Sequence, residues 1–191
     1  VTNEINAALG LGADQVTSVV KRGGFVASEN MLSDAVFAIF NNEQPVLKDL
    51  QLRQALVQGT NRHAIIAAIN GRATALDGPL PHSFVPNETM TEATFNRDAA
   101  KAKLDALGWK LVNGTRQKDG VALELTVVAP DSGDYKILLD ELTKQWKELG
   151  VNVKGQLADA ATIVPDYLQP RGYDVLLYEL AIGPDPDVFA Y

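Results

Sequence analysis

The chain has 191 residues, of which 46% are hydrophobic and 21% are charged, a balance typical of one compact globular domain. Its formal net charge of −7 disfavours a protein that follows nucleic-acid phosphates, because such proteins carry a basic face. The absence of cysteine excludes disulfide scaffolds and thiolate metal sites, and two histidines exclude a histidine-rich metal site. We therefore expect no metal and no other cofactor.

Residues 1–23 are weakly patterned. Residues 13–20 predict a short helix, and residues 24–28 and 35–40 predict two short strands from their Phe, Val and Ile content. We expect these strands to contribute an antiparallel part of a sheet.

Residues 46–81 predict two short helices followed by an irregular segment rich in Gly and Pro. Asp49 and Asn61 are placed to cap the two helices. Apolar residues at helical spacing follow each cap: Leu52, Ala55 and Leu56 in the first helix, and Ile65, Ile66 and Ile69 in the second. The connection that follows is long and contains His82, and long connections are usually functional.

The rest of the chain alternates helices and strands. The elements expected in chain order are a helix over 97–107 capped by Asn96, a strand over 121–129, a helix over 135–149, a strand from 151, a helix near 160–168 and a strand over 173–180. The strongest helix, 135–149, carries one continuous apolar stripe formed by Leu138, Leu139, Leu142, Trp146 and Leu149.

Strand, helix, strand, helix, strand over residues 121–180 predicts parallel pairing with right-handed crossovers. The expected fold class is α/β, a mixed sheet with parallel strands and flanking helices. In open parallel sheets, ligands bind beyond the carboxyl ends of the strands, and the loop 180–187 is at such a place.

Acidic residues gather near that loop, at Glu179, Asp185 and Asp187. Two interpretations remain open. Such carboxylates can perform acid–base chemistry or hold a cation, which, together with His82, suggests a hydrolase-type enzyme. Alternatively, the two Asp residues bond local backbone N–H groups, as Asp commonly does after a Gly-Pro turn.

Six segments resemble, in the same order, the motifs of the extracytoplasmic solute-binding proteins that serve peptide and nickel ABC importers. They are DLQLRQAL at 49–56 with NRHAII at 61–66, GPLP at 78–81, FNRDAAKA at 95–102 leading to LGW at 107–109, KDG at 118–120, WKELGV at 146–151, and YDV at 173–175 leading to DPDVF at 185–189. Together they cover about residues 40–191.

The resemblance implies one lobe of a longer, two-lobed binding protein rather than an enzyme. Residues 1–45 would lead into the lobe with N-terminal strands, and residues 46–191 would form an incomplete second lobe, within one domain overall. Family members bind their ligand between the lobes, and hinge closure couples binding to recognition by the transporter. The implied partners are a peptide or other small molecule, an ABC permease and the missing first lobe, with no nucleic acid. The implied location is extracytoplasmic, in the periplasm or at the cell surface through a lipid anchor.

Two positions depart from the family pattern GWxxDYPDP, whose first Asp pairs with the α-amino group of a peptide in peptide binders. Aligned on Asp185, this chain has Glu179 in place of the Trp and Ile182 in place of that Asp. Isoleucine cannot pair with an ammonium group, and Glu179 is the nearby acid that can replace it. The ligand-binding residues implied by the resemblance are Tyr178, Glu179, Ile182, Asp185 and His82.

Overall fold

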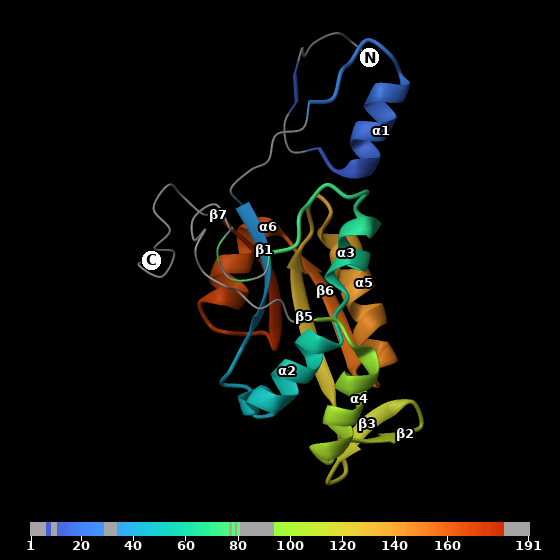
Figure 1. Ribbon diagram of the computed structural model, residues 1–191. Helices are drawn as coiled ribbons and strands as arrows, with labels where there is room; N and C mark the ends of the chain where they lie inside the picture. Colours follow the sequence, from blue (N-terminus) through green and yellow to red (C-terminus); the bar gives the residue numbers. More distant parts are fainter. Residues whose placement is uncertain are drawn as a thin grey trace.

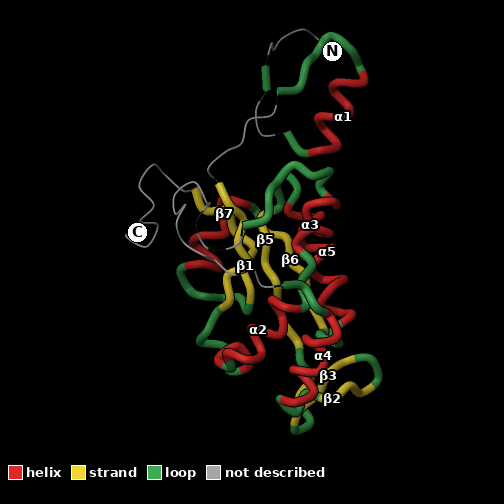
Figure 2. The backbone as a smooth tube through the Cα atoms, in the orientation of Figure 1, coloured by secondary structure: helices red, strands yellow, loops and turns green. Residues whose placement is uncertain are grey.

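The computed structural model describes residues 7–8, 11–28, 34–76, 78, 80 and 94–181. Figures 1 and 2 show the arrangement of its elements. In chain order they are α1 (Ala13–Lys21), β1 (Asp34–Phe40), η1 (Val46–Lys48), α2 (Leu50–Gln58), α3 (Arg62–Ala68), α4 (Arg97–Ala106), β2 (Lys110–Val112), β3 (Thr115–Lys118), β4 (Val121–Ala122), β5 (Glu124–Pro130), α5 (Tyr135–Glu148), β6 (Asn152–Ala158), α6 (Ala160–Thr162), η2 (Ile163–Leu168) and β7 (Val175–Ala181).

Four strands form the main sheet in the order β1-β7-β5-β6. β5 runs parallel to β6 and to β7, and β1 runs antiparallel to β7. The predicted α/β fold, with parallel strands between residues 121 and 180 and an antiparallel N-terminal strand, is therefore confirmed. The short strands β2, β3 and β4 form a separate antiparallel sheet at the opposite end of the molecule from α1 (Figure 1).

Helices cover both faces of the main sheet. On one face, α2, α4 and α5 pack against β5 and β7 in a core that includes Leu52, Leu104 and Trp146. On the other face, Ile163 of η2 packs with Val128 and Leu176. Because both faces are buried, the middle of β5 is a continuous apolar run rather than an alternating one. The result is a three-layer arrangement with the sheet in the middle (Figure 1).

Predicted helix starts coincide with real caps. The side chain of Asp49 accepts hydrogen bonds from the N–H groups of Gln51 and Leu52, and Asn61 and Asn96 cap α3 and α4 in the same way. The stripe of Leu52, Ala55 and Leu56 is completely buried, as expected. The apolar stripe of the second helix is less deeply buried: Ile69 is buried, whereas Ile65 and Ile66 are half-buried. The reason is that α3 packs on the outside of α5.

Three sequence-based expectations require correction. Residues 24–28 form no strand, and Val26 is 96% exposed. The strand expected over 121–129 is divided, because Val121–Ala122 pairs with β3 whereas Glu124–Pro130 pairs with β6 and β7. The helix expected near 160–168 is a single α-helical turn followed by a π-helical turn, which contains Pro165 and its missing N–H.

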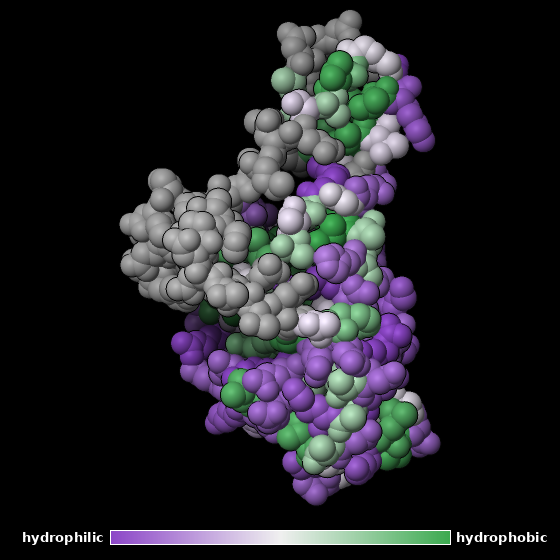
Figure 3. Space-filling model, in the orientation of Figure 1, coloured by the Kyte–Doolittle hydropathy of each residue, from purple (hydrophilic) through white to green (hydrophobic). Residues whose placement is uncertain are grey.

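The face of the molecule seen in Figure 3 is mostly polar, with apolar side chains exposed at several places, the small sheet among them. Figure 3 shows hydrophobic side chains gathered at the end of the molecule where β2 and β3 lie. The exposed fractions of Leu111 and Val121 are 60% and 59%. This sheet lies far from the carboxyl ends of the parallel strands, which position the candidate site.

Candidate functional site

The carboxyl ends of β5, β6 and β7 meet at one edge of the main sheet, which we call the carboxyl edge. The N–H of Asp131, directly after β5, donates to the carbonyl of Ala158 at the end of β6, at 2.7 Å. The loop 131–134 then leads into α5, and the last residues of β7 complete the edge. In open α/β sheets this is the edge at which ligands bind.

Two of the predicted ligand-binding residues, Tyr178 and Glu179, lie on β7 at this edge. They pair with Phe37 and Val36 of β1. Because neighbouring strand residues point to opposite faces, the structure does not bring the two side chains together. Tyr178 is half-buried on the face covered by η2, whereas Glu179 is exposed. His82, Ile182, Asp185 and Asp187 lie outside the described residues.

Sequence reasoning missed Tyr135, the first residue of α5. Its ring packs against the core on the α5 face, and the carboxylate of Glu179 lies close enough to act on its hydroxyl electrostatically. Burial, together with the nearby carboxylate of Glu179, raises the pKa of Tyr135 to about 12. Its only signal in the sequence is its place at the start of a helix that directly follows a parallel strand.

The raised pKa of Tyr135 is directly testable. In a spectrophotometric titration, the component lost in Tyr135→Phe should have a midpoint near pH 12, whereas an ordinary tyrosine titrates near pH 10. Because the folded-state pKa exceeds the unfolded one, the protonated phenol favours folding fully below about pH 10. This contribution is lost as the pH rises towards 12. A lost component with a midpoint near 10 would contradict the described environment.

Arg72 links three segments beside the carboxyl edge. Its guanidinium donates to the carbonyl of Leu11 at 2.8 Å and lies 3.5 Å from the carboxylate of Asp134. Leu11 comes just before α1, and Asp134 just before α5, so Arg72 joins the N-terminal segment to the loop that follows β5. α1 accordingly lies beyond this edge, at the same end of the molecule (Figure 1).

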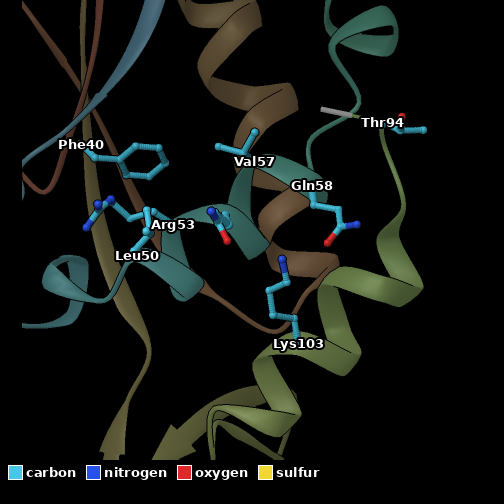
Figure 4. Close-up of a pocket in the computed structure, with 8 residues that line it drawn as sticks. Phe40, Leu50, Arg53, Val57, Gln58, Thr94 and Lys103 are labelled. Carbon is cyan, nitrogen blue, oxygen red and sulfur yellow. The ribbon is translucent and has the colours of Figure 1, made fainter. Parts of the chain in front are cut away.

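A broad hollow of about 610 Å³ lies elsewhere, between α2 and α4, and is lined by Phe40, Leu50, Arg53, Gln54, Val57, Gln58, Thr94 and Lys103. Figure 4 shows Lys103 and Gln58 extending toward each other, with Phe40 and Arg53 at the other end. Phe40 pairs with Val175, the first residue of β7, so the hollow lies away from the carboxyl edge.

Arg53, one of the charged residues of this hollow, has a role within the fold. The guanidinium of Arg53 donates to the carbonyls of Leu47 and Lys48 and thereby closes the end of η1. Arg53 is therefore used within the fold. We place the candidate site at the carboxyl edge, because the topology of the sheet and the predicted residues both point there.

Two absences hold for the described part of the chain. Nowhere in it do three or more His, Asp or Glu side chains come close enough to one another to hold a metal ion. Among the same residues, none of the helices has the length and apolar character of a membrane-spanning segment.

Comparison with known proteins gives a match over the whole chain. The family model described as bacterial extracellular solute-binding proteins, family 5 Middle, matches residues 1–191. The oligopeptide-binding protein AppA of Bacillus subtilis is 25% identical over 169 residues, which is 81% of this chain and 30% of AppA.

Solved structures show the same fold. The structure of Bacillus subtilis AppA in complex with a nonapeptide matches with a TM-score of 0.79 at 22% identity, covering 92% of this chain and 37% of that one. NikZ from Campylobacter jejuni, in complex with Ni(L-His), also matches with a TM-score of 0.79, at 21% identity, covering 92% and 35%. The chain thus spans about a third of the length of these relatives.

Proposed function

Because the chain belongs to the bacterial extracellular solute-binding proteins of family 5, we propose that it is part of the substrate-binding component of an ABC importer. In this proposal the component captures peptides or similar small polar solutes and delivers them to a permease in the membrane. The observation that carries the proposal is the family match over all 191 residues. The name of the relative AppA, an oligopeptide-binding protein, supports peptides as the ligand class.

The same family argues against the alternative function. It is a family of solute-binding transport proteins rather than of enzymes, so a hydrolase that uses Glu179, Asp185 and Asp187 with His82 is not supported. Glu179 is also exposed and points to the α5 face.

We infer that residues 46–191 form part of one lobe, preceded by residues 1–45, and that a first lobe of the same protein completes the cleft. The β1–β7 pairing supports one domain, because the N-terminal strand lies within the main sheet. The proposed location is extracytoplasmic, in the periplasm or at the cell surface through a lipid anchor, and the family description as extracellular supports it.

The proposed ligand contacts are Tyr178, Glu179, Ile182, Asp185 and His82. Glu179 is exposed at the carboxyl edge, and within the described residues no Lys or Arg forms an ion pair with it. Its carboxylate is therefore available to a ligand ammonium group. This proposal assigns to Glu179 the charge that Ile182 lacks.

The test uses the full-length gene product that carries residues 1–191. Its affinity for alanine peptides of two to nine residues is measured by calorimetry, with each peptide in free-amine and N-acetylated form. We expect the free amines to bind more tightly. Glu179→Gln should reduce this preference about five-fold, since an exposed ion pair contributes up to about 1 kcal/mol.

Glu148→Gln is the matched control, because Glu148 is a partly exposed acid at the far end of α5, paired with Arg97. It should leave both affinities unchanged. If no peptide of the series binds the unmodified protein, peptides are the wrong ligand class. If peptides bind but Glu179→Gln keeps the full preference for free amines, Glu179 is not the group that replaces the missing acid.

A further inference from the structure

The helix α1 carries an apolar face formed by Val16, Val19 and Val20, which fall at helical spacing. Val20 is 44% exposed, and the other two valines are half-buried. Among the residues that the structure describes, none of α1 belongs to either core cluster. Figure 3 accordingly shows hydrophobic side chains at the surface around α1. Because an isolated helix of nine residues is marginal in water, this valine face needs a partner.

The described contact between the N-terminal segment and the rest of the molecule is polar. Arg72 donates to the carbonyl of Leu11 and forms an ion pair with Asp134, in which the two side chains are 28% and 21% exposed. A Cβ atom on Gly12 would lie 3.1 Å from Oδ1 of Asp134, so the main chain passes close to this ion pair. These contacts involve the residues that precede α1 and not its valine face.

We propose that the valine face of α1 packs against the first lobe of the same protein, and that Arg72 and Asp134 lie where the two lobes meet. The inference rests on the proposed function, since its partner is the first lobe inferred there. The chain covers only about a third of the length of the relatives it matches, so enough polypeptide lies outside it to cover α1. α1 also lies beyond the carboxyl edge, the side of the molecule on which the first lobe is expected (Figure 1).

The proposal gives Arg72 a specific place. Leu11 comes just before α1, so the hydrogen bond from Arg72 to its carbonyl crosses from the second lobe to the segment that is attached to the first. The helix itself is then held by apolar contacts of its valine face, which contribute more than a partly exposed ion pair does. Removing the guanidinium should therefore leave α1 folded, whereas a charge on the valine face should unfold it locally.

Amide hydrogen exchange of the ligand-free, full-length gene product tests this arrangement. In the unmodified protein, the amides of α1 should exchange at least about 100-fold more slowly than in an unfolded chain, because the helix is covered. The same protection is expected at low and at high protein concentration, since the partner is part of the same polypeptide.

Three variants identify what covers the helix. Val16→Asp places a charge on the valine face and should speed exchange in α1 at least about ten-fold. Ser18→Asp is the matched control, because it adds the same charge at an exposed position of the same helix. It should leave exchange within about two-fold, and so should Arg72→Gln. Val20→Ser, a smaller change on the valine face, replaces Val16→Asp if that variant does not fold.

Each outcome decides the proposal. Slow exchange that is lost in Val16→Asp, but kept in Ser18→Asp and in Arg72→Gln, supports it. Rapid exchange in the unmodified protein overturns it, because nothing would then cover α1. Protection that falls on dilution also overturns it, because the partner would be a second copy of the protein. Equal acceleration in Arg72→Gln and Val16→Asp would mean that α1 is held by the second lobe alone, and equal acceleration in Ser18→Asp would mean that the valine face is not the covered one.

The proposed function fails by a different measurement. If no alanine peptide binds the unmodified protein, peptides are the wrong ligand class, but the exchange of α1 is measured without ligand and is unaffected by that result. Conversely, rapid exchange in α1 together with tight peptide binding would overturn the contact proposed for α1 and leave the proposed function standing.

Discussion

Replacing Arg116 with alanine is expected to lower the free energy of unfolding by about 3–5 kcal/mol, because it removes a buried cation on which several carbonyl groups depend. Arg116 lies in β3 and is only 3% exposed. Urea denaturation monitored by the fluorescence of Trp109 and Trp146 measures the change, since both rings lie in the main core.

The guanidinium of Arg116 connects the ends of two helices. Its Nε donates to the carbonyl of Leu149, at the end of α5, at 2.6 Å. One terminal nitrogen donates to Asp105 and to the carbonyl of Trp109, at 2.7 and 2.6 Å, and the other donates to the carbonyl of Lys101 at 3.2 Å. The last turn of a helix leaves carbonyls without intrahelical partners, and Leu149 caps the end of α5, so Arg116 satisfies there a group that would otherwise be buried and unpaired.

The ion pair with Asp105 is the smaller part of this effect. The hydrogen bond from Arg116 holds the pKa of Asp105 below its usual range, but about half of the Asp105 side chain is exposed to solvent. Asp105→Asn should therefore cost less than about 1 kcal/mol.

Two further variants test whether the lost hydrogen bonds to carbonyl groups cause the loss of stability in Arg116→Ala. Arg116→Met keeps the length of the side chain without its donors and should be nearly as damaging as alanine. Lys136→Ala is the control, since Lys136 forms an exposed ion pair with Asp140 and should change stability by less than about 0.5 kcal/mol. If Arg116→Met were as stable as the unmodified chain, the carbonyl contacts would not be the cause.

Local signals in the sequence predicted the helices and their starts well. A cap such as Asp49 or Asn96 acts on N–H groups within three residues, so its effect is visible in a short window. The same holds for the stripe on α5, where a period of 3.6 residues marks the buried face. The alternation of strands and helices was also enough to predict the parallel part of the sheet.

Features that depend on distant partners were not predictable. Arg116 stands between two turns in a short polar strand, which suggests an exposed residue. Its burial depends on main-chain groups at Lys101, Trp109 and Leu149, which carry no side-chain signal.

The same limit applies to the candidate site. The resemblance led to Tyr178 and Glu179 as neighbours, but β7 turns their side chains to opposite faces. The proximity of Tyr135 to Glu179 joins positions 135 and 179 of the sequence, and it arises because α5 follows β5, the strand beside β7. No spacing rule in the sequence reports which strands are neighbours.

Gly59 provides the last test. The effect of Gly59→Ala on the free energy of unfolding should depend on the side chain at position 149, and its sign should change when Leu149 is shortened. Gly59→Ala is expected to lower the free energy of unfolding by about 1–3 kcal/mol. A Cβ atom at this position would lie 2.5 Å from Cδ1 of Leu149 and 3.2 Å from the Cβ of Ala100. Leu149 is 1% exposed and Ala100 is fully buried, so neither side chain can move into solvent. The backbone of Gly59, with φ −84° and ψ 0°, suits any residue, and backbone strain contributes nothing.

Shortening the Leu149 side chain should abolish the destabilisation caused by Gly59→Ala. In a Leu149→Ala background, itself destabilised by about 2–5 kcal/mol, the added methyl group enters space that Leu149 has vacated. Gly59→Ala should then be neutral or stabilising by about 0.4–1 kcal/mol, because alanine restricts the unfolded chain more than glycine does. Urea denaturation of the four chains of this double-mutant cycle measures the coupling directly. Equal destabilisation by Gly59→Ala in both backgrounds would show that α2 and α5 do not approach each other at Gly59 as described.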